Sequence, residues 1–200
     1  VYKRQFYGCQ SLTSAIIPDS VTEIGSDAFN SCYDMTQIHL SNSLKRIEDG
    51  AFTNCRKVQD IVVPNGVTEI GDSAFSSVTD LRTVSLPEGL QQIGEYAFYA
   101  TDLNTIQIPD SVIAIGDHAF YSCELLSGSL TLPANVTSVG QMAIYDTNLN
   151  SVYINGSASF IGRMAFFSWK REVANEIHYA GTMEQFNAAA RNDTYSDEYR

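Results

Sequence analysis

The phrase Ile93-Gly94-Glu95-Tyr96-Ala97-Phe98 decides the fold, because it recurs with few changes along almost the whole chain. Further copies of the phrase, some of them degenerate, begin at Ile24, Ile47, Ile70, Ile115, Val139 and Ile161. The position of its last residue is occupied by Phe6, Phe29, Phe52, Phe75, Phe98, Phe120, Ile144 and Phe166, so successive steps are 22 to 24 residues. A fixed period in this range indicates stacked units that share one long core, and the sequence therefore predicts a solenoid.

Each repeat is predicted to contain two short strands. Segments such as Leu81–Leu86 and Leu103–Ile108 end in an apolar–polar–apolar alternation, which is the pattern of a strand with one buried face. All five prolines follow this segment at the same place in the repeat, where a strand ends and a turn begins, namely Pro18, Pro64, Pro87, Pro109 and Pro133. A second short segment such as Val67–Ile70 leads to the glycine, which allows a backbone conformation or a close approach that a side chain would block.

After the glycine we expect about one helical turn. An acid often stands early in this stretch, at Asp49, Asp72, Glu95 or Asp117, and an acid suits a helix N-terminus. The small alanine and the large phenylalanine that follow are expected to fill the middle of the coil. The first strands of successive repeats are expected to form one continuous parallel sheet.

The repeated pattern Ile-x-Ile-Pro-x-x-Val-x-x-Ile-Gly-x-x-Ala-Phe, with a cysteine three residues after the phenylalanine, resembles the leucine-rich repeat. It is most similar to the BspA-like subfamily found in bacterial surface proteins. The resemblance departs at Glu48, at Ile144, and at Ser127-Gly128 and residues 169–172, where extra residues lengthen a repeat. We expect an α/β leucine-rich-repeat solenoid of about eight coils of 22–24 residues, with a parallel sheet on one face and short second strands and helical turns elsewhere.

The solenoid is expected to span residues 1–180, starting within a repeat of a longer protein, and residues 181–200 to form a capping helix and a frayed tail. Thr182 and Gln185 fit a capping box at the start of this helix. Met183, Phe186 and Ala190 fall on one helix face, which we expect to close the open end of the core. Similar Tyr-Ala-Gly-Thr-x-Glu-Gln segments end the repeat arrays of the BspA-like family.

The composition excludes several classes of partner. Twelve basic and 23 acidic residues give a net charge of −11, which argues against binding to nucleic acid or to an anionic membrane surface. No apolar run approaches the length that spans a bilayer, so no membrane insertion is expected from this sequence.

The four cysteines occupy one position of the repeat, three residues after the phenylalanine position; they are Cys9, Cys32, Cys55 and Cys123. Neighbouring members of such a column lie near disulfide range. However, three neighbours cannot all pair, and Cys123 has no neighbour, so buried free thiols are favoured. Tetrahedral zinc is disfavoured, because no Cys-x-x-Cys or paired histidine accompanies them.

No catalytic constellation can be assembled from the repeat positions. His39 and His178 stand at solvent-facing strand positions and His118 in the predicted helical turn, all interpreted as surface residues. No pair of carboxylates stands apart from the repeat pattern. We therefore expect a protein that is not an enzyme and has no cofactor, metal or catalytic residue.

Two columns of residues are candidate binding surfaces. The first is the outward row of the predicted sheet, where variable side chains stand on a regular scaffold: His39, Val62, Ser85, Gln107, Thr131, Tyr153 and His178. The alternative for this row is a merely solvated sheet face. The second, a fallback, is an aromatic stripe directly after the phenylalanine position: Tyr99, Tyr121, Tyr145 and Phe167. Such a stripe suits protein or sugar contact, but covering the core is the favoured interpretation.

The resemblance implies a non-enzymatic binding or adhesion module of a bacterial cell-surface or secreted protein, located outside the cell. Its partner is expected to be a protein, of the host or extracellular, with a glycan as the other ligand class. Two other functions stay open, because fold alone does not decide function. One is a structural spacer. The other is an accessory module of a larger surface enzyme or carbohydrate-binding protein.

Overall fold

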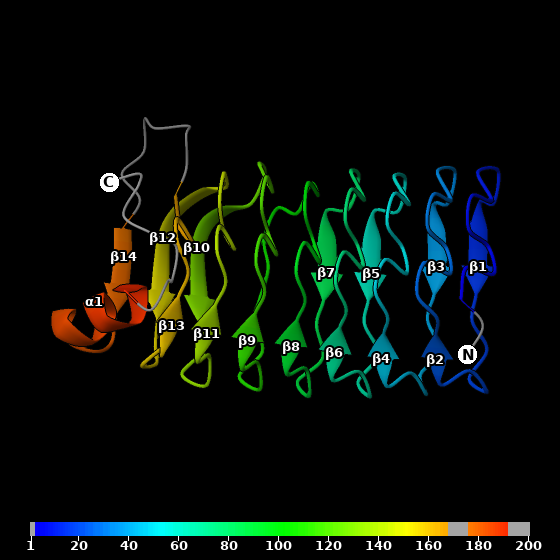
Figure 1. Cartoon of the computed structure of the whole chain (residues 1–200). Coiled ribbons are helices and arrows are strands. Elements are labelled where there is room, and N and C mark those ends of the chain that lie inside the picture. The colour runs from blue at the N-terminus through cyan, green and yellow to red at the C-terminus, as the bar shows by residue number, and fades with distance from the viewer. Residues whose placement is uncertain (1–2, 168–175, 192–200) are drawn as a thin grey trace.

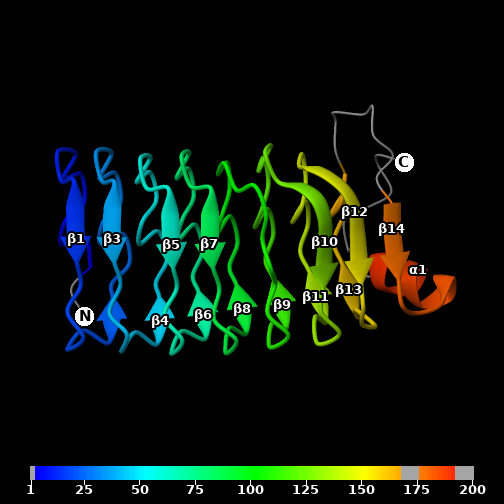
Figure 2. The ribbon, with the colours of Figure 1, turned by 180° about the vertical axis from the view of Figure 1, so that it is seen from behind.

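The computed structural model describes residues 3–167 and 176–191, which form an elongated, mostly β solenoid with parallel strands (Figure 1). Two rows of strands run along the rod, and β1 and α1 lie at its opposite ends (Figures 1 and 2). One row, called the long-strand row, consists of β1 (Ser14–Ile16), β3 (Gln37–His39), β5 (Asp60–Val62), β7 (Thr83–Ser85), β10 (Ser127–Leu132), β12 (Asn148–Ile154) and β14 (Glu176–Tyr179). The predicted solenoid is thus confirmed.

The other row, called the short-strand sheet, is one continuous seven-stranded parallel sheet. Its members have two residues each: β2 (Glu23–Ile24), β4 (Arg46–Ile47), β6 (Glu69–Ile70), β8 (Gln92–Ile93), β9 (Ala114–Ile115), β11 (Ser138–Val139) and β13 (Phe160–Ile161). These are the predicted second strands. Each contributes one exposed or half-buried residue and one buried isoleucine or valine, so one side of the sheet faces the core.

The continuous sheet was expected in the wrong row. The long-strand row divides into three separate sheets, β1-β3, β5-β7 and β10-β12-β14, and the predicted strand at Leu103–Ile108 pairs with no neighbour. Strand length does not explain these breaks, since the two-residue strands of the short-strand sheet form one continuous sheet. Around Leu103–Ile108 the breaks coincide with unequal repeat lengths. Nothing in the repeat lengths explains the break between β3 and β5.

The core is built on a ladder of stacked phenylalanine rings. Consecutive members of Phe6, Phe29, Phe52, Phe75, Phe98 and Phe120 stack with ring centroids 4.9 to 5.5 Å apart and nearly parallel planes. Phe52 to Phe120 are almost fully buried, as are the alanines beside them. The repeat interval thus places the largest apolar side chain of every coil against its equivalents in the coils on either side.

The helical turn expected after the glycine is absent from the described coils, and a tight turn replaces it. In six coils the turn places a non-glycine residue in the left-handed region, at Asp27, Ser73, Tyr96, His118, Met142 and Met164, which no α-helix allows. The backbone groups are satisfied partly within the turn, as where Ala74 N–H donates to the carbonyl of Gly71 at 3.3 Å, and partly between coils. For example, the N–H of Phe75 donates to the carbonyl of Ala97 and that of Phe98 to the carbonyl of Ala119, both at 2.8 Å.

The acids in this turn serve a different role from the predicted one at a helix N-terminus. The carboxylate of Asp49 accepts the backbone N–H of Asp72 at 3.0 Å, and that of Asp72 accepts the N–H of Glu95 at 2.8 Å. Asp117 accepts the N–H of Gln141 in the same way at 2.7 Å. Each carboxylate therefore fixes the start of the turn in the next coil.

The repeated glycine is required by close approach of neighbouring coils. A Cβ atom on Gly94 would lie 2.6 Å from the backbone carbonyl carbon of Gly71, and one on Gly116 would lie 2.6 Å from that of Gly94. At Gly94 and Gly116 such distances leave no room for a side chain unless the backbone shifts, because the obstructing atoms are backbone, whereas one coil carries Glu48 at the equivalent position.

The predicted capping helix is present as α1 (Met183–Arg191). Its capping box is formed in both directions, since Thr182 N–H donates to Gln185 Oε1 at 2.8 Å and Gln185 N–H donates to Thr182 Oγ1 at 3.2 Å. The predicted packing face is wrong in part: Met183 is 73% exposed and Ala190 is exposed, while Ala189 is buried and Phe186 packs edge-on against Tyr179. The helix is rotated so that Phe186 and Ala189 meet the core. The tail predicted to fray begins at residue 192, outside the described residues.

Among the described residues, no helix has both the length and the apolar character needed to cross a membrane.

Candidate functional site: a groove in the long-strand row

The outward residues of the long-strand row form one exposed face. The seven residues proposed from the sequence all lie on it and are all exposed, one in each coil: His39, Val62, Ser85, Gln107, Thr131, Tyr153 and His178. They alternate with inward residues such as Ile61 and Leu130, which are buried. The row thus presents one exposed side chain from each of seven coils on the same face.

This face carries apolar and aromatic groups at both ends. Ile16 on β1 and Val62 on β5 are 77% and 72% exposed. At the other end, the rings of Tyr153 and His178 stack with centroids 4.4 Å apart and planes at 6°, and His178 Nε2 lies 3.2 Å from a carboxylate oxygen of Glu176. The two ends of the face are therefore less polar than its middle, where Ser85, Gln107 and Thr131 stand.

The neighbouring outward column is held by hydrogen bonds between coils. The hydroxyl of Thr83 donates to the carboxylate of Asp60, and the hydroxyls of Ser129 and Ser151 lie 2.8 Å apart. These four side chains are therefore tied in two pairs, whereas the side chains of Ser85, Gln107 and Thr131 beside them make no hydrogen bond among the described residues.

Between β7 and β10 the long-strand row is interrupted. The segment Thr105–Ile108 belongs to no sheet, although its side chains alternate outward and inward as in a strand. Within the part of the chain that the structure describes, none of its backbone N–H or carbonyl groups makes a hydrogen bond. The coil is held at Asn104, whose N–H donates to Arg82 and whose carbonyl accepts from Ser127.

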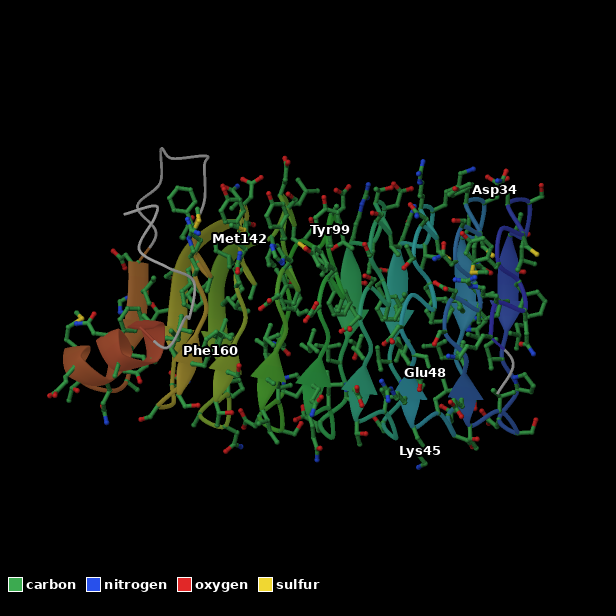
Figure 3. All side chains as sticks on the ribbon, viewed as in Figure 1. Asp34, Lys45, Glu48, Tyr99, Met142 and Phe160 are labelled. Carbon is green, nitrogen blue, oxygen red and sulfur yellow. The ribbon has the colours of Figure 1, made fainter. Side chains whose placement is uncertain are left out.

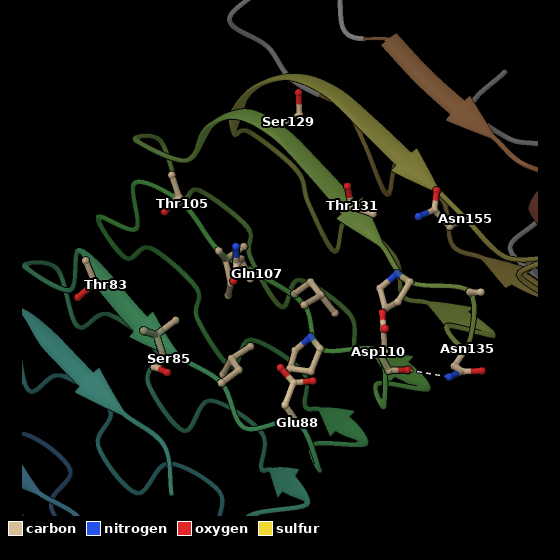
Figure 4. Close-up of a pocket in the computed structure, with 17 residues that line it drawn as sticks. Thr83, Ser85, Glu88, Thr105, Gln107, Asp110, Ser129, Thr131, Asn135 and Asn155 are labelled. Carbon is tan, nitrogen blue, oxygen red and sulfur yellow. Dashed lines mark hydrogen bonds between the residues drawn. The ribbon is translucent and has the colours of Figure 1, made fainter. Parts of the chain in front are cut away.

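A groove of about 880 Å³ lies over this interruption (Figure 4). Its walls come from four successive coils: residues 83–86 with Glu88, residues 105–110, Ser129 and Thr131 with residues 133–135, and Asn155. The labelled side chains in Figure 4 are hydroxyls, amides and two carboxylates, and Ser85, Gln107 and Thr131 from the proposed face are among them. A hollow of this volume is within the size range of ligand sites.

The groove coincides with a change in repeat length. The phenylalanine-to-proline interval is 12 residues from Phe75 to Pro87, 11 from Phe98 to Pro109 and 13 from Phe120 to Pro133. The segment without ladder hydrogen bonds therefore lies in a coil that is shorter than both of its neighbours. Gly128 has φ of 81°, and beyond it the pairing of β10 with β12 shifts register, with Asn150 of β12 skipped.

The groove has a negative rim. The carboxylates of Glu88 and Asp110 both line it, and neither has a hydrogen-bond or ion-pair partner among the described residues. Asn135 donates to the backbone carbonyl of Asp110 at 2.7 Å, so the carboxylate of Asp110 itself stays free (Figure 4). Among the residues that the structure describes, no lysine or arginine lines the groove. It is therefore suited to a neutral or cationic ligand.

The aromatic stripe lies on the turns and is largely part of the packing. Tyr99, Tyr121, Tyr145 and Phe167 stack in sequence with centroids 4.8 to 5.6 Å apart, but Tyr145 is only 3% exposed. Figure 3 shows Tyr99 and Met142 over the half of the rod away from the short-strand sheet, in which Phe160 lies. The stripe thus offers half-buried ring edges rather than a free surface.

His118 departs from the surface role expected for it. It is half-buried, and its ring stacks on Tyr96 with centroids 4.6 Å apart and planes at 1°. Tyr96 and His118 occupy the left-handed turn position that holds Asp27 and Ser73 in earlier coils. They therefore add to the aromatic packing of the turns.

The cysteines are free thiols, and three of the four are buried. Cys55 Sγ lies 3.2 Å from the carbonyl of Phe29, and Cys123 Sγ lies 3.1 Å from that of Phe98, so each thiol donates to the preceding coil. Burial raises the pKa of Cys55 to about 12 and that of Cys123 to about 11. Cys9, expected to be buried, is exposed because it lies in the terminal coil of the described rod.

The described residues contain no cluster of three or more His, Cys, Asp or Glu side chains that could hold a metal ion. A second, smaller hollow of about 260 Å³ lies over the short-strand sheet and is lined by Glu69, Asp72, Glu95 and Asp117. Burial, and then the carboxylates of Asp72 and Asp117, raise the pKa of Glu95.

The interpretation of the sequence missed the groove itself and the residues that shape it, Glu88, Asp110, Asn135 and Asn155. The usable signal was the 12, 11 and 13 residue intervals between phenylalanine and proline.

These features define the class of protein: a parallel β-solenoid of the leucine-rich-repeat type, with a free strand face and tight turns opposite. The family of BspA type leucine rich repeat regions matches in six copies, over residues 1–127 and 47–173. The chain belongs to this family, as the motif predicted.

Solved structures agree with this assignment. A leucine-rich repeat protein from Bacteroides ovatus ATCC 8483 is 25% identical, with 90% of this chain and 56% of that one covered and a TM-score of 0.65. The T. pallidum leucine rich repeat protein TpLRR is 29% identical, with 76% and 64% covered and a TM-score of 0.59. The pneumococcal vaccine antigen PcpA shares the fold at 21% identity, with 88% and 58% covered and a TM-score of 0.54.

The chain thus spans less than two thirds of the length of these structures. No curated protein matches the chain.

Proposed function

We propose that the chain is a non-enzymatic binding module of a bacterial cell-surface or secreted protein, and that it binds a protein partner on the long-strand row. One observation supports this most: the exposed face combines exposed apolar groups with a groove in which the side chains of Ser85, Gln107 and Thr131 make no hydrogen bond among the described residues. The family to which the chain belongs supports a location outside the cell.

The experiment selects partners with the chain itself as bait. A display library of extracellular protein domains is selected on the immobilised chain, and the affinities of the selected domains are measured for variants of the face. His39→Ala and Tyr153→Ala, both at exposed positions, are expected to weaken binding at least tenfold while leaving the melting temperature unchanged.

Matched controls are Tyr99→Ala and Tyr121→Ala, which alter the aromatic stripe and leave the face intact. If the selected domains lose affinity for the stripe variants and bind the face variants normally, the partner surface is the stripe and the proposal is wrong. If domains cannot be selected at all, the structural-spacer function replaces it.

A further inference from the structure

We propose that the groove over Thr105–Ile108 binds an extended segment of a partner protein through its main chain, and that this segment carries a lysine or arginine. The inference rests on the proposed function, since it names how a protein partner engages the same face. The groove would then bind main chain, which is a role separate from contact with the exposed side chains of the long-strand row.

The first argument is that main-chain atoms form part of the groove wall. Residues 105–108 line it without a gap in the sequence, although the side chains of Ile106 and Ile108 point into the core and are buried. Inward and outward residues can all line one hollow only when their backbone also faces it. The groove therefore exposes the main chain of Thr105–Ile108.

The second argument is that this main chain lacks its partners. The backbone groups of Thr105–Ile108 make no hydrogen bond among the described residues, β7 pairs only with β5, and β10 is not joined to Thr105–Ile108. Strand edges with free N–H and carbonyl groups are templates for pairing with another chain. An extended peptide presents alternating donors and acceptors at the strand repeat, as no other common ligand does.

The third argument is charge. Glu88 and Asp110 are free carboxylates on the rim, and the groove has no cationic side chain. A lysine or arginine on the bound segment would meet these carboxylates, whereas an acidic segment would be repelled by them and by the net charge of −11. The open stretch of Thr105–Ile108 matches a bound segment of about four residues, because paired strands share one residue spacing.

The hydroxyls and amides of the groove would also suit a neutral oligosaccharide, so the test must separate the two ligand classes. The probes are a fluorescent eight-residue peptide of alternating lysine and valine, the same peptide with alternate amides N-methylated, a glutamate–valine version, and chitohexaose and cellohexaose as neutral sugars. Binding is measured by anisotropy or calorimetry, and the contacted amides by NMR chemical-shift changes.

We expect the lysine peptide to bind and to shift the amides of Thr105–Ile108. N-methylation and the glutamate version should each weaken binding at least tenfold, because one removes main-chain donors and the other reverses the charge. Glu88→Lys with Asp110→Lys should also weaken it at least tenfold. The matched control is Glu23→Lys, an exposed acid on β2 in the other row, which should leave the affinity within twofold.

The inference is overturned if the peptide does not bind, if the N-methylated peptide binds equally well, or if a neutral sugar binds in its place. These outcomes are distinct from failure of the proposed function. Selected protein domains that need Tyr153 and ignore the reversal at Glu88 and Asp110 would uphold binding on the face and reject main-chain docking in the groove.

Discussion

Replacing Phe75 with alanine tests the stacked core in its middle. Phe75 is fully buried, and its ring stacks on Phe52 at 5.5 Å and on Phe98 at 5.4 Å. Because both neighbouring rings are fixed by their own coils, the site cannot collapse to fill the cavity. We therefore expect Phe75→Ala to lower the free energy of unfolding by about 4–5 kcal/mol, the upper part of the range for buried aromatics.

The same ladder offers graded controls. Phe6 has one stacking neighbour and is 42% exposed, so Phe6→Ala should cost only about 1 kcal/mol, a fraction of the value for a fully buried phenylalanine. Phe75→Leu should lower the free energy of unfolding by an intermediate amount, about 1–2 kcal/mol, since one coil of this chain already carries an aliphatic residue, Ile144, at this position.

The assay is urea unfolding followed by far-UV circular dichroism, with tyrosine fluorescence as a second probe of whether the transition is cooperative. The predicted order of destabilisation is Phe75→Ala, then Phe75→Leu, then Phe6→Ala. Equal losses for Phe75→Ala and Phe6→Ala would show that the rings do not form one continuous core, and the repeat register would have to be abandoned.

Three further predictions concern other parts of the coil. Gly94→Ala should destabilise the fold by about 1–3 kcal/mol in the same urea assay, because its Cβ would meet the backbone of Gly71; an unchanged midpoint would refute the close approach. Unfolded cysteines ionise near the ordinary pKa of 9.0, while burial raises the pKa of Cys55 to about 12, so the free energy of unfolding should fall as the pH rises above 9. Cys55→Val should make this fall with pH less steep, and an equally steep fall in the variant would contradict the prediction. In the unbound protein, the amides of Thr105–Ile108 should exchange with deuterium at least tenfold faster than those of β12, and equal protection would mean that the ladder is intact.

The repeat period predicted most of the fold because every repeat places an equivalent apolar side chain in the shared core. Stacking of Phe52, Phe75 and Phe98 requires the same position of the coil to return at nearly equal intervals, and the sequence shows such intervals. The capping box at Thr182 was also predictable, since it depends on two side chains three residues apart.

The failures arise where the structure depends on contacts between coils. Asp49 and Asp72 looked like residues of a helix N-terminus, but their carboxylates bind the next coil, and sequence spacing within one coil does not show this. The face of α1 was predicted wrongly because the apolar pattern of a nine-residue helix is compatible with either Met183 or Ala189 facing the core.

The candidate site was predictable only in part. Alternation along each strand placed Ser85, Gln107 and Thr131 on one exposed face, because the side-chain period of a strand is two. The groove among them depends on the loss of ladder hydrogen bonds around a shortened coil. A one-residue change in an interval shows where such a loss can occur, but it does not give the shape of the hollow.

The most direct test of the central claim is a hydrogen–deuterium exchange footprint of a bound protein domain. If the partner binds the long-strand row and its groove, protection on binding will gather at residues 83–88, 105–110 and 129–135, and the turns from Tyr96 to Ala100 and from His118 to Ser122 will exchange as in the free chain. Protection confined to those turns, with residues 105–110 unchanged, would contradict the account.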